Sequence, residues 1–236
     1  MLQQNLRKTA GWGGLRKGAG RPRNGRKQTH CVRLLHKERF PLHVTLKARR
    51  SGLRTDCVRG EFEALLRRLR RRRQDFRVLQ YSLQDNHLHL IVESSDRETL
   101  SSGMQGLGSG LARVINRVLG SGGTLWADRY HARELRTPRE VRHALVYVLR
   151  NSAKHLGRAQ TRDRFSSAPW FDGFAEEPVA AAPSSSHGPV STGRTWLSKV
   201  GWRVRGGPLT SNERPKTPPA ADVFLDYSEI PDALRR

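Results

Sequence analysis

Alternating apolar and polar positions predict three strands in the first half of the chain. All three segments have the residue types of strands, and the last follows the period of two that is typical of a half-buried strand. The segments are HVTLKA at 43–48, FRVLQYSL at 76–83 and HLHLIVE at 87–93. The polar turn QDN at 84–86 lies between the last two and favours an antiparallel hairpin. In the third strand, Leu88, Leu90 and Val92 share one face and are expected to point toward a core.

Three further segments repeat their apolar residues at helical spacing. The first carries a stripe of Phe62, Leu65, Leu66 and Leu69. The second, residues 98–120, holds four glycines between positions 103 and 110. Each of them costs about 1 kcal/mol relative to alanine, so this helix is expected to be broken or loose there. The third runs from Thr137 to about His155 and opens with the threonine, proline and glutamate of a capping box.

The order strand, helix, strand, strand, helix, helix predicts an α+β fold. It is typical of a ferredoxin-like antiparallel sheet packed by helices on one face, with the 87–93 strand in the centre. Residues 124–137 (TLWADRYHARELRT) are expected to form a short hairpin or loop. Changes in composition then suggest four parts of the chain. They are a basic, glycine-rich flexible arm (1–39), a folded domain (40–157), a linker (158–194) and a small basic, aromatic element with a tail (195–236).

The charge of the 236-residue chain points to a polyanionic partner. Its 44 Lys and Arg face 21 Asp and Glu, a formal net charge of +23, and nucleic acid is the commonest partner for such an excess. Neither of the two cysteines belongs to a C-x-x-C pair, so both are interpreted as free thiols in a reducing compartment. The sequence shows no secretory signal and no apolar run near the roughly 20 residues that span a membrane. We therefore expect a cytoplasmic, nucleoid-associated protein without a membrane partner.

The basic residues are clustered rather than spread along the chain. Residues 1–29 hold eight Lys or Arg and no acidic residue, and the segment Gly20–Arg23 resembles the core of an AT-hook, although a nonspecific phosphate-binding tail explains it as well. Six of the seven residues from 67 to 73 are arginine, and their mutual repulsion would be relieved by phosphate. The predicted DNA-binding residues are Arg21, Arg23, Arg67, Arg70, Arg71, Arg129 and Arg133.

Two histidines share the polar face of the third strand. His87 and His89 lie two residues apart, so both side chains point to the same side of the sheet. They could be two partly buried histidines, each satisfied by a hydrogen bond. On the last helix, Tyr147 and Asn151 are four residues apart and project together. Two imidazoles and one amide oxygen suit Mn²⁺ or Mg²⁺, and a tyrosine hydroxyl beside them is a nucleophile for a phosphodiester.

Three motifs within residues 40–157 together resemble a known family. NHLHLIVE, WADRYHARELRTPREV and YVLRN, in this order, look like the single-tyrosine HUH transposases and are most similar to the REP-associated tyrosine transposases. The resemblance implies that His87 and His89 bind the metal and that Asn151 is the third ligand. It also implies that Tyr147 forms a 5′-phosphotyrosine bond with single-stranded DNA. The expected function is a metal-dependent endonuclease and strand-transferase on hairpin-forming repeats, acting as a monomer or homodimer.

Three alternatives and two departures from the family pattern stand beside this interpretation. Tyr130 is a rival nucleophile, and Tyr147 is preferred because a ligand-type residue lies one turn away from it on a well-capped helix. A transposase-derived protein could bind DNA without catalysis. His43-Val44-Thr45 matches half of the motif pair of 2H phosphoesterases, whose second half is missing, so His43 is expected at a strand edge. The sequence also has Asp85 where many relatives of the resembled family have proline, and Ser152 where many have proline after the asparagine.

Overall fold

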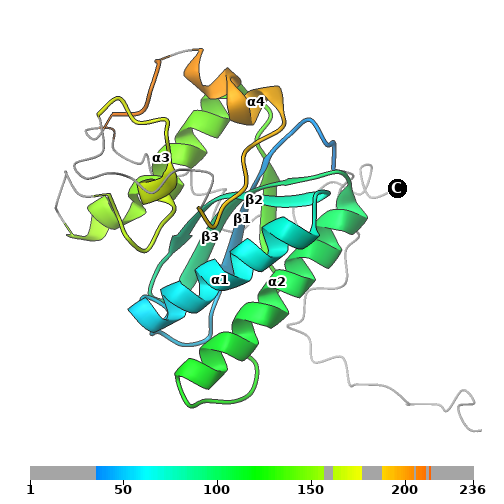
Figure 1. The fold of residues 1–236 in the computed structure, drawn as a ribbon, viewed down its shortest axis with the longest axis vertical. Coiled ribbons are helices and arrows are strands. Elements are labelled where there is room, and N and C mark those ends of the chain that lie inside the picture. The colour runs from blue at the N-terminus through cyan, green and yellow to red at the C-terminus, as the bar shows by residue number, and fades with distance from the viewer. Residues whose placement is uncertain (1–35, 157–161, 177–187, 205, 211–212, 214–236) are drawn as a thin grey trace, which may run out of the picture. The chain divides into compact units, whose positions relative to one another are not determined.

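A four-stranded antiparallel sheet forms the centre of the protein. The computed structural model describes residues 36–156, 162–176, 188–204, 206–210 and 213, and of residues 151–156 only the backbone. The strands are β1 (Leu42–Lys47), β2 (Phe76–Leu83), β3 (His87–Ser94) and β4 (His131–Glu134), in the order β2-β3-β1-β4. The helices are α1 (Asp56–Arg72), α2 (Arg97–Val118), α3 (Pro138–Leu156) and α4 (Trp196–Lys199). The predicted α+β fold with an antiparallel sheet packed by helices is confirmed (Figure 1).

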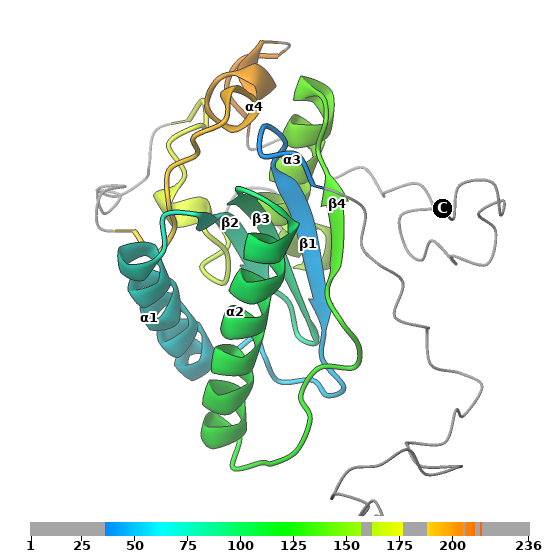
Figure 2. The ribbon, with the colours of Figure 1, turned by 90° about the vertical axis from the view of Figure 1, so that its right-hand side faces the viewer.

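The helices α1 and α2 cover one face of the sheet (Figures 1 and 2). Leu88, Leu90 and Val92 of β3 are fully buried against them, as the alternation of β3 predicts. α1 begins after Thr55, whose hydroxyl accepts a hydrogen bond from the N–H of Val58 (3.3 Å). This apolar layer is the larger part of the core and holds the sheet rigid beneath its opposite face.

α2 is one continuous helix, so the expected break at its glycines is wrong. The physical reason is close packing against the sheet. A Cβ added at Gly103 would lie 2.3 Å from Cγ of Phe76, and one added at Gly110 would lie 3.1 Å from Cδ2 of Leu65. Gly103 leaves no space for a side chain against the Phe76 ring, whereas a methyl group at Gly110 would require a small shift of Leu65 in α1. This close packing against β2 and α1 stabilises the helix despite its low propensity.

The second face of the sheet is also covered, although only one packed face was expected. α3 packs on it with its buried residues Val141, Leu145 and Val148, which meet Ile91 of β3. The short helix η1 (Ala168–Trp170), α4 and the short helix η3 (Gly201–Arg203) extend this second layer. The polar face of β3 therefore lies inside the molecule, and this is the face that carries His87 and His89.

Segments that follow α3 protect the outer edge of β2. The N–H of Leu83 donates to the carbonyl of Phe165 (2.8 Å), and the N–H of Ser191 donates to the carbonyl of Val78 (2.8 Å). An edge strand with its backbone groups paired in this way is shielded from joining another chain. The four-part division of the chain remains a prediction, but residues on both sides of position 177 contact β2. Among the described residues, no helix combines the length and apolar character needed to cross a membrane.

Candidate active site

The register between β1 and β3 fixes which side chains share the site. Thr45 lies opposite His89 and Lys47 lies opposite His87, so these four side chains lie on the α3 face of the sheet. His89 is 7% exposed, whereas His87 is half-buried near the end of its strand. Their rings are nearly parallel, with centroids 6.2 Å apart. The two histidines form a rigid pair that opens toward the end of the sheet.

Each imidazole has one nitrogen held by a hydrogen bond. Nδ1 of His87 lies 2.5 Å from Oδ1 of Asn86, and Nδ1 of His89 lies 3.1 Å from Oγ1 of Thr45. An amide oxygen can only accept, so Nδ1 of His87 carries the proton and Nε2 presents a lone pair. Such a partner on the far nitrogen is the usual arrangement of a metal-binding histidine. The sequence left open that both histidines are simply satisfied by hydrogen bonds. The hydrogen bonds observed here fit that interpretation, and the same bonds would also orient two metal ligands.

Both histidines are held in their neutral form. Burial lowers the pKa of His87, and the charge of Lys47 lowers it further. Burial lowers the pKa of His89 well below its ordinary value, with smaller contributions from His43 and His87. A metal ligand has to be the neutral imidazole. At neutral pH the pair is therefore ready to bind a cation without releasing protons.

Tyr147 lies over this pair. The predicted capping box begins α3, with the N–H of Glu140 donating to Oγ1 of Thr137 (3.2 Å) and the N–H of Thr137 donating to Oε2 of Glu140 (3.0 Å). Two and a half turns later, the Tyr147 ring meets the His89 ring edge-on, with centroids 5.1 Å apart. Burial raises the pKa of Tyr147, so its hydroxyl is protonated at neutral pH.

His43 belongs to the same site, although it was expected at a strand edge. β1 lies between β3 and β4, and the His43 ring lies 5.6 Å from that of His89 and 5.7 Å from that of Tyr147. The spacing of His43, Thr45 and Lys47 at every second residue was a signal for a shared polar face. His43 was missed because the pattern of a single strand does not show which face of the sheet α3 covers.

The rival nucleophile Tyr130 lies on the opposite side of the sheet. Its partly buried ring packs against the apolar layer made with α1 and α2. Tyr147 therefore contacts His89, whereas Tyr130 packs in the layer of α1 and α2.

A divalent cation fits the donors that the site offers. His87 and His89 supply two neutral imidazoles with oriented nitrogens. Among the described side chains, no group of three histidine, cysteine or acidic residues could hold a metal ion. The side chain of Asn151, the predicted third ligand, lies outside the described part of the chain, whereas its backbone continues α3 one turn beyond Tyr147.

Asp85 stabilises the turn that presents His87. Its carboxylate accepts a hydrogen bond from the N–H of Gly52 (2.9 Å), and its carbonyl accepts one from the N–H of Leu53 (2.9 Å). The hydrogen bond from Gly52 and another from Ser51 lower the pKa of Asp85. An aspartate at this position therefore ties the β2–β3 turn to the loop after β1, where many members of the resembled family carry proline.

The predicted DNA-binding arginines of α1 lie across the sheet from the histidines, because α1 packs on the other face. Arg71 is exposed. Arg67 donates to Oε2 of Glu63 (3.5 Å), and Arg70 donates to the carbonyl of Gly188 (2.9 Å). These two side chains also have structural partners, so α1 and the site form separate basic surfaces.

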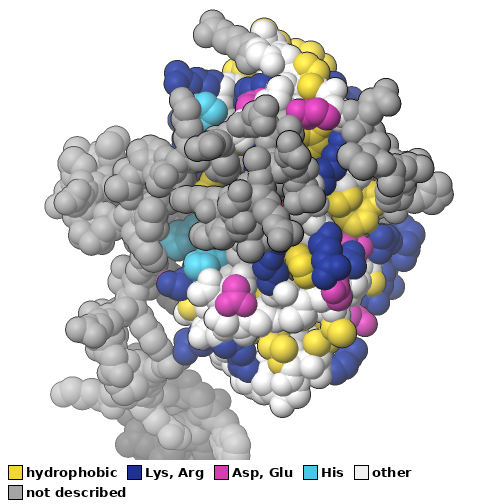
Figure 3. Space-filling view, turned by 90° about the vertical axis from the view of Figure 1, so that its left-hand side faces the viewer, with side chains coloured by type: hydrophobic (Ala, Val, Ile, Leu, Met, Phe, Trp, Pro, Cys, Tyr) yellow, Lys and Arg dark blue, Asp and Glu magenta, His cyan; other side chains and the backbone are white. Residues whose placement is uncertain are grey.

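The remaining predicted arginines lie elsewhere. Arg133 of β4 is opposite His43 in the register and donates to Oε1 of Glu140 at the start of α3 (3.0 Å). Arg129 is exposed just before β4. Figure 3 shows histidine side chains that reach the surface of one face of the molecule, with Lys and Arg close to them. Arg21 and Arg23 fall outside the described residues.

Comparison with known proteins identifies the family. Residues 37–150 match the model of the IS200-like transposases. A solved REP-associated tyrosine transposase bound to a REP hairpin is 18% identical, with a TM-score of 0.46 over 59% of this chain and 82% of that chain. A bacterial tRNA(His) guanylyltransferase-like protein in complex with GTP is 12% identical, with a TM-score of 0.37 over 52% and 69%. No curated protein matches. Residues 37–150, which carry the histidine pair and the helix tyrosine, thus match the IS200-like transposases, a family of HUH tyrosine enzymes that act on DNA.

Proposed function

We propose that this transposase cuts and rejoins single-stranded DNA through a covalent bond between Tyr147 and a 5′ phosphate. The observation that carries the proposal is the contact between the rings of Tyr147 and His89, 5.1 Å apart within one chain. This contact also supports an active site built within a single molecule, as a monomer or as each half of a homodimer. The motifs shared with the REP-associated tyrosine transposases favour hairpin-forming repeat DNA as the substrate.

The reaction transfers a phosphoryl group from a 3′ oxygen of the DNA to the hydroxyl of Tyr147. Oη of Tyr147 attacks the phosphorus, the bond from phosphorus to the 3′ oxygen breaks, and the DNA is released with a free 3′ hydroxyl. The tyrosine loses its proton and the leaving oxygen gains one, so the reaction is balanced without a co-reactant. Attack by a 3′ hydroxyl on the phosphotyrosine reverses the step and joins two strands. The energy of the broken bond is kept, so no ATP is needed.

The residues of the site have three proposed roles, which are nucleophile, metal ligand and positioning of the ligands. Burial keeps the hydroxyl of Tyr147 protonated until a substrate is in place, which limits side reactions. His87 and His89, with Asn151 as third ligand, would hold Mg²⁺ or Mn²⁺. Such a cation neutralises the charge that develops on the phosphate oxygens. Thr45 and Asn86 orient the two imidazoles through their Nδ1 atoms.

The test is the covalent adduct. Full-length protein is incubated with labelled single-stranded hairpin DNA and Mn²⁺, and protein-bound label is measured on a denaturing gel. Tyr147→Phe removes one oxygen and keeps the ring, so the adduct should vanish while hairpin binding persists. Tyr130→Phe is the matched control and should retain the adduct. An adduct that persists in Tyr147→Phe and vanishes in Tyr130→Phe would make the proposal wrong.

The metal ligands are tested in the same assay. His87→Ala and His89→Ala should each abolish the adduct and leave hairpin binding within a few-fold of the unaltered protein. Asn151→Ala should lower the yield and recover in part at higher Mn²⁺, because a neutral amide is a weak ligand. Adduct yields unchanged in both histidine variants would show that the pair has no role in the reaction.

A further inference from the structure

A buried carboxylate clamps a short C-terminal segment onto the sheet. Glu93 of β3 is 1% exposed, and its Oε2 accepts hydrogen bonds from Nη2 (2.6 Å) and Nε (3.1 Å) of Arg77. Its two oxygens also accept from the N–H groups of Arg194 (2.9 Å) and Thr195 (2.9 Å) and from the hydroxyl of Ser198. Burial would raise the pKa of Glu93, but these hydrogen bonds lower it overall. The start of α4 is thus fixed to the sheet by an ionised group.

The apolar side chains of residues 196–204 are buried on one side of the segment and exposed on the other. Leu197 and Trp202 are buried in the apolar layer with α3. On the other side, Trp196 is 57% exposed, Val200 51% and Val204 61%. Trp196 begins α4, Val200 is its C-cap residue and Val204 follows η3, and these three exposed apolar side chains are called the outward patch below. They are three of the four large apolar side chains exposed on the described part of the protein.

The Trp196 ring is held flat against the backbone. A Cβ added at Gly201 would lie 2.7 Å from Cζ3 of Trp196, so the indole rests on this glycine with no room between them. One side of the ring is therefore fixed, and much of the remainder faces solvent. An immobilised aromatic surface loses little conformational entropy when it binds a flat partner.

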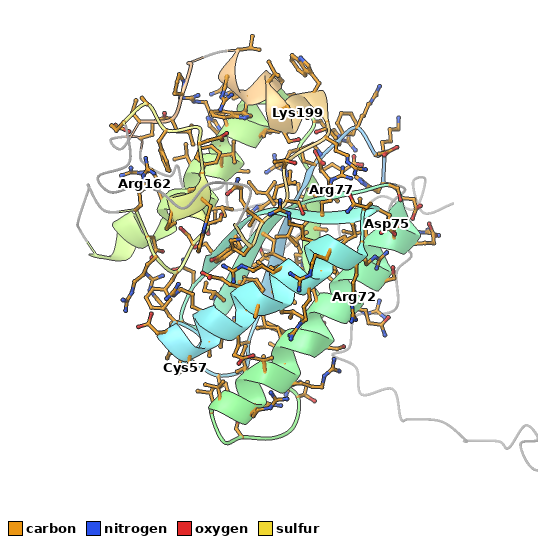
Figure 4. All side chains as sticks on the ribbon, in the orientation of Figure 1. Cys57, Arg72, Asp75, Arg77, Arg162 and Lys199 are labelled. Carbon is orange, nitrogen blue, oxygen red and sulfur yellow. The ribbon has the colours of Figure 1, made fainter. Side chains whose placement is uncertain are left out.

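Positive charge surrounds this patch. Lys199 and Arg203 are exposed beside it, and Arg203 lies 3.9 Å from Asp172 in a long ion pair. Residues 188–204 contain no acidic residue. Figure 4 shows Lys199 at the end of the molecule formed by α4. Aromatic rings among basic side chains are the usual platform for single-stranded nucleic acid.

We propose that the patch of Trp196, Val200 and Val204, with Lys199 and Arg203 beside it, binds single-stranded DNA through an unpaired base stacked on Trp196. The proposal rests on the proposed function for the identity of the DNA. β3 rises about 3.3 Å per residue, so Glu93 and the clamped segment begin roughly 13 Å from His89. One DNA strand can span both places, so this surface would hold the unpaired DNA that flanks the cleavage site.

The experiment compares two DNAs and four variants of the full-length protein. A blunt hairpin and the same hairpin with an unpaired oligothymidine tail are titrated by fluorescence anisotropy with EDTA present, so that no cleavage occurs. Trp196→Ala should bind the tailed hairpin about 5- to 100-fold more weakly, the range that stacking of one base covers, with the blunt hairpin unaffected. Trp196→Phe should recover most of the difference. Val118→Ala, the fourth exposed apolar residue, is the matched control and should change neither affinity.

The salt dependence of the affinity distinguishes base stacking from phosphate contacts. Trp196→Ala should leave the slope of log affinity against log salt unchanged, because it removes no phosphate contact. Lys199→Ala should reduce the slope for the tailed hairpin by about one ion. This variant alters an exposed side chain, so it tests the surface even where Trp196→Ala fails to fold. An unchanged slope in Lys199→Ala would then overturn the proposal.

Three outcomes contradict the proposal without touching the proposed function. Equal affinity of folded Trp196→Ala and unaltered protein for the tailed hairpin shows that the patch does not bind DNA. Equal loss on both hairpins shows that no unpaired base is stacked. Self-association that disappears in Trp196→Ala, with DNA affinity unchanged, assigns the patch to a protein contact. The proposed function fails separately, when unaltered protein forms no covalent adduct with hairpin DNA and Mn²⁺.

Discussion

Burial of His89 makes the stability of the protein dependent on pH. The pKa of His89 is held well below 6.5, mainly by burial, with smaller contributions from His43 and His87. The unfolded chain takes up a proton near 6.5 and the folded chain does not. The free energy of unfolding should therefore be at its full value above pH 6.5 and decline as the pH falls below it. Urea denaturation across a pH series measures this decline.

The contribution of His89 is isolated by substitution. His89→Gln removes the titrating group, so the decline below pH 6.5 should become shallower. His143→Gln alters an exposed histidine of α3 and is the matched control, with little effect on the slope. The same pH dependence in His89→Gln and in unaltered protein would show that His89 is not protonated on unfolding in this range.

The choice between the two tyrosines shows how far single residues can be interpreted from sequence. Spacing alone favoured Tyr147, because Asn151 follows one helical turn later. The structure separates the tyrosines by a stronger criterion, since Tyr147 contacts His89 and Tyr130 packs in the opposite layer. Alternation along β3 was sufficient to pair His87 with His89. It could not reveal His43, because the partner of a strand face depends on register and on which helix covers it.

The glycines of α2 give a pair of opposite predictions. A Cβ at Gly103 would overlap the Phe76 ring at 2.3 Å, whereas a Cβ at Gly106 meets nothing within 4 Å. Gly103→Ala should lower the free energy of unfolding by about 1–3 kcal/mol through overpacking. Gly106→Ala should raise it by about 1 kcal/mol through helix propensity. Urea denaturation of both variants measures the difference, and changes of the same sign would contradict the close packing of α2.

Glu93 gives a prediction for the C-terminal segment. Glu93→Gln leaves the Arg77 charge buried beside a neutral amide and weakens the clamp on α4. Removal of one partner of a buried pair costs about 3–5 kcal/mol, and the retained amide should keep the loss toward the lower end. Glu98→Gln breaks an exposed ion pair with Arg97 and should change stability little. Equal stability of the two variants in urea would show that Glu93 is not a structural anchor.

Helices and strands were predictable from the sequence where the pattern involves only residues that are close together along the chain. The period of β3, the capping box of α3 and the hairpin between β2 and β3 all depend on residues close in sequence, and each was predicted correctly. The continuity of α2 depends on Phe76, which is distant in sequence. The attachment of α4 to the second face depends on Glu93, more than 100 residues before Ser198. Such tertiary contacts leave no periodic pattern, so the role of residues 188–204 was not visible.

Positive charge is distributed over more than one surface of the molecule. Arg71 of α1 lies across the sheet from Arg133, which is opposite His43. Arg67 and Arg70 combine their charge with contacts to Glu63 and to the backbone. A net charge of +23 therefore does not predict one binding face, and each basic region contributes separately to the attraction for DNA.

We expect the basic N-terminal residues to contribute to that attraction in proportion to their charge. Residues 1–29 hold eight Lys or Arg and no acidic residue. Each phosphate they neutralise releases counterions, at about 0.9 ion for duplex DNA and 0.7 for a single strand. Deletion of residues 1–29 should reduce both the affinity for hairpin DNA and the salt slope. At saturating DNA, the covalent adduct should still form, because none of the proposed catalytic residues is removed.

A second variant separates charge from chain length. Replacement of the eight basic residues by glutamine keeps the length and should reproduce the smaller salt slope of the deletion. Anisotropy titrations of hairpin DNA across a salt series give the slopes of all three proteins. A slope that stays unchanged in both variants would show that the N-terminal residues do not contact phosphate. A loss confined to the deletion would assign their effect to a contact other than charge, because glutamine keeps the backbone and removes only the positive groups.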